Sequence, residues 1–89
     1  MKSRTTERFR KAFSELPDPI KDQARQAYRQ FLLNPRHAGL RFKKVHPKLP
    51  IYSLRVGIGY RAVGRAYAEE IEWFWIGTHA DYDRLLSQL

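Results

Sequence analysis

The first third of the chain carries apolar residues at the spacing of amphipathic helices. The earliest run has the spacing i, i+3, i+4 and i+7 and consists of Phe9, Ala12, Phe13 and Leu16. This spacing places the four side chains on one helical face, which predicts a helix over residues 5–16 with Thr5 or Thr6 as its N-cap. The segment Pro17-Asp18-Pro19 then interrupts the pattern.

A second helix is predicted to follow this break. Asp18 can cap it, and Pro19 suits its first turn because the amide hydrogen that proline lacks has no partner there. Its apolar positions again repeat at helical spacing and are Ile20, Ala24, Ala27, Tyr28, Phe31 and Leu32. Asn34-Pro35 ends the pattern, so we expect a helical hairpin whose two helices share one apolar side.

After residue 40 the hydrophobic period changes from 3.6 to 2, the period of β-strands. The predicted strands cover residues 41–46, 51–56, 60–68 and 70–76. Residues 81–88 fit a short closing helix that Asp81 caps. Helices followed by strands with short connections predict a single α+β domain over residues 1–89. In it, the N-terminal helical hairpin packs on one face of a four-stranded antiparallel sheet.

The segment YSLRVGIGYRAVG, residues 52–64, has the pattern of a β-hairpin with the loop Gly57-Ile58-Gly59. A three-residue loop with glycine last matches the hairpin type that needs a left-handed residue at that position. This loop length places Arg55 directly opposite Arg61, and like charges in such a pair destabilise a sheet. We therefore interpret the pair as an anion-binding feature on the face that the helices leave open. The alternative is that both guanidiniums extend into water on their aliphatic stems.

The predicted last strand, IEWFWI at residues 71–76, is apolar on both faces. Strict alternation sets Ile71, Trp73 and Trp75 on one face against Phe74 and Ile76 on the other. An aromatic ring on the open face could stack on a nucleic-acid base. For any single ring, packing in the core is the favoured interpretation.

The charge of the chain is unevenly distributed. The formal net charge is +8, and residues 41–65 contain no acidic residue. The basic residues of this block are Arg41, Lys43, Lys44, Lys48, Arg55, Arg61 and Arg65. Since surfaces usually mix charges of both signs, the block favours a polyanionic or acidic protein partner. The alternative is a solvated, solubilising surface. We expect a cytoplasmic protein, because the chain has no cysteine, no apolar run long enough for a membrane span and no signal-peptide pattern.

Several chemically active side chains follow the last strand in quick succession: His79, Asp81, Tyr82 and Asp83. Histidine, carboxylate and phenol groups can perform acid–base chemistry, and they are equally ordinary turn and cap residues. His37, His46 and His79 lack the spacing of metal ligands, so we expect no zinc site and no cofactor.

The order of these segments resembles the RelE/ParE superfamily of bacterial toxin–antitoxin toxins. Three pieces carry the resemblance: Asn34-Pro35 followed by LRFKKV, the hairpin YSLRVGIGYRAVG, and a last strand ending in IGTH before a short helix. The resemblance covers nearly the whole chain. The superfamily contains ribosome-dependent mRNA endonucleases and catalytically inert gyrase poisons. Its members commonly begin with a strand, which in this sequence is very short or absent.

The resemblance to the endonuclease branch implies roles for particular residues. Arg55 matches a basic residue of the second strand, Arg61 the arginine of a Tyr-Arg pair in the third, and His79 the basic residue after the last strand. Tyr82 falls near a tyrosine that some members use. The resemblance thus implies catalytic roles for Arg55, Arg61, His79 and Tyr82, and RNA binding by Lys43, Lys44, Arg41 and Arg65. Ser53 departs from the pattern, since some members have a second lysine there.

Three functional hypotheses follow. The leading one is a metal-independent endoribonuclease toxin that cuts mRNA, on the ribosome, by attack of the 2′-OH on the adjacent phosphate. Arg55 and Arg61 would hold the phosphate, and His79 would transfer a proton because its ordinary pKa of about 6.5 lies near neutrality. The second is a ParE-like, non-catalytic inhibitor of DNA gyrase, and the third a non-catalytic nucleic-acid-binding domain. A basic toxin also implies an acidic antitoxin as its partner.

Overall fold

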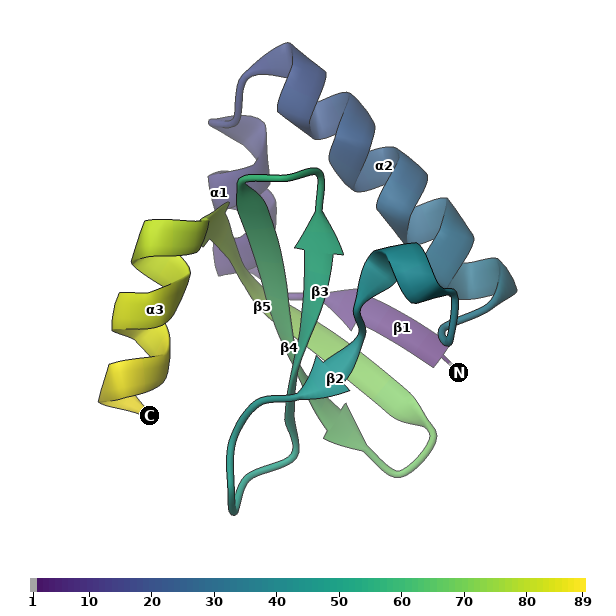
Figure 1. Ribbon diagram of the computed structural model, residues 1–89, viewed down its shortest axis with the longest axis vertical. Coiled ribbons are helices and arrows are strands. Elements are labelled where there is room, and N and C mark those ends of the chain that lie inside the picture. Colours follow the sequence, from purple (N-terminus) through teal and green to yellow (C-terminus); the bar gives the residue numbers. More distant parts are fainter. Residues whose placement is uncertain (1) are drawn as a thin grey trace.

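The computed structural model describes residues 2–89 and has three helices and a five-stranded mixed sheet over these residues (Figure 1). The helices are α1 (Glu7–Ser14), α2 (Asp18–Leu33) and α3 (His79–Gln88), with a short 3₁₀ turn at Ala38–Leu40. The strands are β1 (Lys2–Thr5), β2 (Lys43–Lys44), β3 (Ile51–Val56), β4 (Tyr60–Tyr67) and β5 (Glu70–Thr78). The α+β class and both N-terminal helices are confirmed.

The sheet differs from the predicted four-stranded antiparallel one by an additional edge strand. Its order is β1-β5-β4-β3-β2, and β1 pairs in parallel with β5. β1 is polar and largely exposed, so it carries no hydrophobic alternation from which a strand could be predicted. Pairing with β5 stabilises it, and the Ser3 hydroxyl accepts a hydrogen bond of 3.0 Å from the indole N–H of Trp73.

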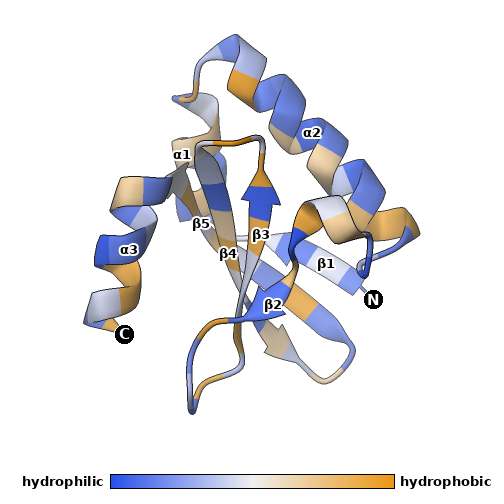
Figure 2. Cartoon of the chain, in the orientation of Figure 1, coloured by the Kyte–Doolittle hydropathy of each residue, from blue (hydrophilic) through white to orange (hydrophobic). Residues whose placement is uncertain are grey.

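One face of the sheet carries the larger core under α1 and α2. Its fully buried members include Phe31 of α2 and Trp73 of β5, whose rings meet edge to face at 5.4 Å. α1 packs mainly against β5 and α2 mainly against β3, so the two helices cover different strands of the same face. The hydrophobic bands of α2 alternate with hydrophilic ones, as expected for a helix that is half covered (Figure 2).

The other face of the sheet is partly covered by α3, which lies across the sheet from α2 (Figure 1). Tyr82 of α3 forms a smaller core there with Ile51 and Val63, and Phe74 and Trp75 pack against it. The prediction of one strictly alternating strand at residues 71–76 was wrong. β4 pairs Val63 with Trp75 but Gly64 with Trp73, so Phe74 is an extra residue in a β-bulge.

Glycine at position 64 is what permits this arrangement. A methyl group there would meet Trp73 at 2.8 Å and Ile71 at 2.9 Å. The absence of a side chain at this position therefore gives room to the side chains of Trp73 and Ile71 on β5.

Several predicted boundaries need correction. Asp18 is the first residue of α2 and Pro17 its N-cap, without a side-chain hydrogen bond. The predicted strand at residues 41–46 shrinks to β2, because the preceding 3₁₀ turn ends at Arg41 in a left-handed conformation with φ of 46°. In the β3–β4 loop, the left-handed residue is Gly57 at the first position, with φ of 59°, rather than Gly59. No helix within residues 2–89 is long and apolar enough to cross a membrane.

Candidate nucleic-acid interface

The centre of the candidate interface is the cross-strand pair of Arg55 and Arg61, whose predicted register is confirmed. Each guanidinium is held by one hydrogen bond to a nearby carbonyl: Arg55 Nε donates to Gly57 at 3.0 Å, and Arg61 Nη1 donates to Tyr60 at 2.8 Å. A guanidinium carries five N–H donors, so most donors of both side chains remain available. In Figure 2, the head of the β3 arrow shows a hydrophilic band between apolar ones.

The electrostatic surroundings of this pair are strongly positive. Burial lowers the pKa of Arg61, and the charge of Arg55 and then that of Arg41 lower it further. Tyr82 and Asp83 act on the same pKa in the opposite direction, which places both residues of α3 near Arg61. Within residues 2–89, neither Arg55 nor Arg61 forms an ion pair with a carboxylate. The pair thus has unsatisfied positive charge, as an anion-binding site requires.

α3 brings His79 to the same end of the sheet. The helix begins after Thr78, whose hydroxyl accepts the amide of Asp81 at 3.2 Å, so Thr78 is the cap and the prediction for Asp81 was wrong. The His79 amide donates to the Gly59 carbonyl at 2.9 Å, which connects the start of α3 to the β3–β4 hairpin that carries Arg55 and Arg61. The partial positive charge of a helix N-terminus adds to the positive potential there.

The imidazole of His79 is oriented by side chains of its own helix. Its Nδ1 lies 3.4 Å from Asp83 Oδ2, and its ring meets that of Tyr82 edge to face at 5.5 Å. Nε2 is thereby the ring nitrogen left for another partner. Tyr82 is only 6% exposed and belongs to the core under α3. Its burial makes Tyr82 a residue that anchors α3, and the catalytic role that the resemblance implies for it stays a prediction.

The remaining predicted RNA-binding residues divide between the faces. We call the face of the sheet that carries Arg55 and Arg61 the arginine face. Lys43 of β2 pairs with Ser53 of β3 and therefore lies on this face; Ser53 is roughly 7 Å along β3 from Arg55. Lys44 pairs with Tyr52 and lies on the helical face. Arg65 lies four residues along β4 from Arg61, and its guanidinium lies over the Tyr67 ring at 5.6 Å. The structure thus brings Arg41, Arg55, Arg61, His79 and Lys43 together and leaves Lys44 and Arg65 outside.

Asp83 is the neighbour that the sequence analysis missed. It was seen only as a member of the cluster, although His79 and Asp83 have the i, i+4 spacing that places two side chains together on a helix. Asp81 pairs with Arg84 rather than with His79. His37 and His46 each accept a local backbone amide in a loop. Among the described residues, no three His, Asp or Glu side chains gather as metal ligands would.

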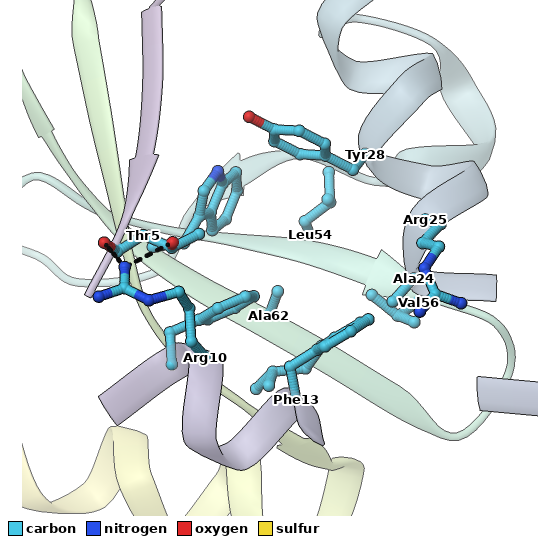
Figure 3. A pocket seen from close by; sticks show the side chains of 12 residues that line it. Thr5, Arg10, Phe13, Ala24, Arg25, Tyr28, Leu54, Val56 and Ala62 are labelled. Atoms are coloured by element: carbon cyan, nitrogen blue, oxygen red, sulfur yellow. Dashed lines mark hydrogen bonds between the residues drawn. The ribbon is translucent and has the colours of Figure 1, made fainter. Parts of the chain in front are cut away.

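A separate apolar groove of about 410 Å³ opens between α1 and α2 on the opposite face of the sheet (Figure 3). Leu54, Val56 and Ala62 form part of its floor, and the guanidiniums of Arg10 and Arg25 lie at its margin. Arg10 donates to the Thr5 carbonyl at 2.7 Å. The groove carries little chemistry and is distinct from the arginine face.

The solved structures to which the chain is similar include toxins of toxin–antitoxin systems. The chain is similar to Escherichia coli RelE in the intact RelBE toxin–antitoxin complex, with a TM-score of 0.66, 20% identity, and coverage of 86% of this chain and 94% of that chain. Isolated E. coli RelE gives a TM-score of 0.67 at 18% identity, covering 99% and 98%. The archaeal RelE–RelB complex from Pyrococcus horikoshii OT3 gives 0.68 at 15% identity, covering 86% and 92%. At these identities, the likeness defines a RelE-like fold.

The sequence itself assigns the family. Residues 18–84 match the ParE-like toxin domain, which is more than half of the chain. The chain therefore belongs to the ParE-like toxin domain family, and the resemblance to the RelE/ParE superfamily is confirmed. No curated protein sequence matches it.

Proposed function

We propose that this toxin is a metal-independent endoribonuclease that binds mRNA on its arginine face and cuts it on the ribosome. The observation that carries the proposal is the cross-strand pair of Arg55 and Arg61, without a carboxylate partner among residues 2–89, beside the start of α3. Like charges facing each other cost stability in a free sheet. An anion between them converts that cost into a binding contribution.

The chemistry needs a phosphate clamp and a proton carrier. The ribose 2′ oxygen forms a bond to phosphorus while the bond from phosphorus to the 5′ oxygen breaks, giving a cyclic phosphate and a free 5′ hydroxyl. Arg55 and Arg61 stabilise the charge on the phosphorane, the electrostatic contribution that usually dominates such catalysis. Nε2 of His79 either accepts the proton of the 2′-OH or donates one to the leaving 5′ oxygen, and water takes the other of these two roles. General acid–base catalysis of this kind contributes about 10²–10⁴-fold.

The proposal includes a cognate acidic antitoxin. RelE of the similar E. coli and Pyrococcus structures is complexed with RelB antitoxins. An acidic partner would complement the net charge of +8. We expect the chain to co-purify with its antitoxin at low salt.

One observation favours a second candidate, the ParE-like toxin that inhibits DNA gyrase without catalysis. Ser53 lies on the arginine face, two residues from Arg55, and is 2% exposed. This position therefore supplies no cation where some endonuclease members have lysine. In that case the arginine face would contact protein or DNA.

Induced expression in a bacterium distinguishes the candidates. Growth arrest with mRNA 5′ ends that map inside coding regions supports the endoribonuclease. DNA breaks and filamentation support the gyrase inhibitor and contradict the endoribonuclease. The absence of toxicity, with folded protein present, contradicts both and leaves the non-catalytic binding domain.

Substitutions then test the site. Arg61→Ala and His79→Ala should each abolish mRNA cleavage while circular dichroism remains that of the folded protein. Arg29→Ala is the matched control, because Arg29 is an exposed arginine of α2 far from the arginine face. Full toxicity of both folded site variants would refute the assignment. Asp83→Asn should retain part of the cleavage and change its pH profile, since Asp83 acts through His79.

A further inference from the structure

The two tryptophans of β5 lie in different environments. Trp73 is 2% exposed in the larger core, and its indole N–H donates to Ser3 at 3.0 Å. Trp75 is only partly buried and lies on the arginine face, where it pairs with Val63 and packs beside the core under α3. Its indole N–H has no hydrogen-bond partner among residues 2–89 and is not sealed from solvent. Trp75 is therefore the tryptophan with an unused polar edge.

The ring of Trp75 extends along the strand toward the arginine pair. A methyl group at Gly77 would meet Cζ2 of Trp75 at 2.8 Å and Cη2 at 2.9 Å, so the ring occupies the space of the missing side chain. Cε2, which bears the indole nitrogen, lies 3.5 Å from the same point. The benzo edge of the indole thus lies at Gly77.

Gly77 is the direct cross-strand partner of Arg61. Cβ positions in such a pair lie about 4.5–5.5 Å apart on the same face. The indole therefore borders Arg61 on the side away from Arg55. An aromatic ring, two guanidiniums and a helix N-terminus meet at this end of the sheet.

We propose that Trp75 is an RNA-contacting residue whose indole stacks on the base next to the phosphate held by Arg55 and Arg61. The inference rests on the proposed function, because it takes single-stranded RNA as the ligand. Basic grooves with aromatic platforms bind single strands in this way, and the stacking tolerates any base because every base has a π-face. Gly77 allows the ring to lie beside Arg61.

The presence of two tryptophans in the chain permits a direct test. Trp73→Phe leaves Trp75 as the sole fluorophore, and Trp75→Phe leaves Trp73. Each is titrated with a 2′-O-methyl RNA oligonucleotide, which cannot undergo 2′-OH attack. Anisotropy of a dye on the RNA reports binding independently. We expect RNA to quench the fluorescence of the Trp73→Phe protein and to leave that of the Trp75→Phe protein unchanged.

Affinity provides the second readout. Trp75→Ala should weaken RNA binding about 5- to 150-fold, the effect of losing one stacked base. The salt dependence of binding should stay the same, because its slope counts phosphate contacts. Arg61→Gln should instead reduce that slope.

The outcomes separate the inference from the proposed function. RNA binding by anisotropy with unchanged Trp75 fluorescence and unchanged affinity of Trp75→Ala overturns the stacking role and leaves the proposed function standing. No binding by the wild-type protein overturns both. If Trp73→Phe fails to fold, 5-fluorotryptophan in the otherwise unaltered chain gives two ¹⁹F resonances, which the Trp75→Phe protein assigns. Only the Trp75 resonance should shift with RNA.

Discussion

The facing arginines predict a repulsive coupling that a double-mutant cycle can measure. The perturbations are Arg55→Gln, Arg61→Gln and their combination, which remove the charges and keep polar side chains. Each single change also removes a hydrogen bond to a carbonyl. The cycle cancels those separate losses and isolates the interaction between the two charges.

The magnitude follows from the cross-strand register. For guanidinium centres about 7 Å apart, Coulomb's law in water gives a repulsion of ~0.6 kcal/mol. Like-charged cross-strand pairs are expected to cost about 0.2–1 kcal/mol. Each single change relieves the same repulsion, so adding the two single effects counts that relief twice. The free energy of unfolding of the double variant should therefore be about 0.6 kcal/mol lower than the value expected from adding the two single effects. At 1 M salt the Debye length of about 3 Å should reduce the coupling to below ~0.1 kcal/mol.

The assay is unfolding in urea, which leaves the ionic strength unchanged, in a buffer without phosphate or sulfate. In RNA binding, the same cycle should show that the two arginines act together, with each single variant losing most of the pair's contribution. A coupling of zero at low salt, or one that persists at 1 M salt, would refute the electrostatic reasoning. An attractive coupling in the free protein would show that the two side chains share a partner.

Two further changes test how α3 is attached. Tyr82→Ala should destabilise the protein by about 3 kcal/mol, as expected for removing a buried aromatic ring, and urea unfolding should show a smaller loss for Tyr82→Phe. Thr78→Ala should cost about 1 kcal/mol as the loss of a helix cap, whereas Asp81→Ala should cost less than about 0.5 kcal/mol, because it removes only an exposed ion pair with Arg84. Equal losses for Thr78→Ala and Asp81→Ala in urea unfolding would contradict the capping geometry.

The arginine pair could be predicted from sequence because loop length fixes hairpin register. Three residues between Val56 and Tyr60 leave one way to align the strands, and Arg55 then opposes Arg61. The position of the left-handed glycine could not be fixed in the same way, since glycine occurs at both ends of the loop. The structure places it at Gly57, whose Cα faces Gln23 of α2.

The faces of β5 escaped prediction for a different reason. Alternation assigns faces only when every residue of a strand has a partner, and the bulge at Phe74 breaks that condition. A glycine inside a strand pattern is a known signal of a bulge, so Gly64 was the sequence feature that indicated a bulge between β4 and β5. The consequence is that Trp73 and Trp75 pack against different cores, although they are two residues apart.

The histidine of the site was predicted, but its surroundings were only partly predicted. The short side chains of Thr78 and Asp81 both suit a helix N-cap, and sequence alone does not choose between them. The structure begins α3 earlier, at His79, which sets Asp83 one turn away on the same side. β1 escaped prediction because its stability comes from pairing with β5 rather than from its own sequence pattern.

The distribution of charge along β5 makes the two ends of the sheet electrically different. At the start of the strand, Glu70 and Glu72 share a single cationic partner, Arg4, so this group keeps a negative charge. Roughly 17 Å beyond Glu72, Gly77 of β5 lies opposite Arg61, and Arg55 follows on β3; neither arginine has a carboxylate partner among residues 2–89. This separation amounts to an electric dipole. A polyanion nearer than the Debye length exerts a torque on it and turns the cationic end forward before contact, which accelerates productive encounter at low ionic strength.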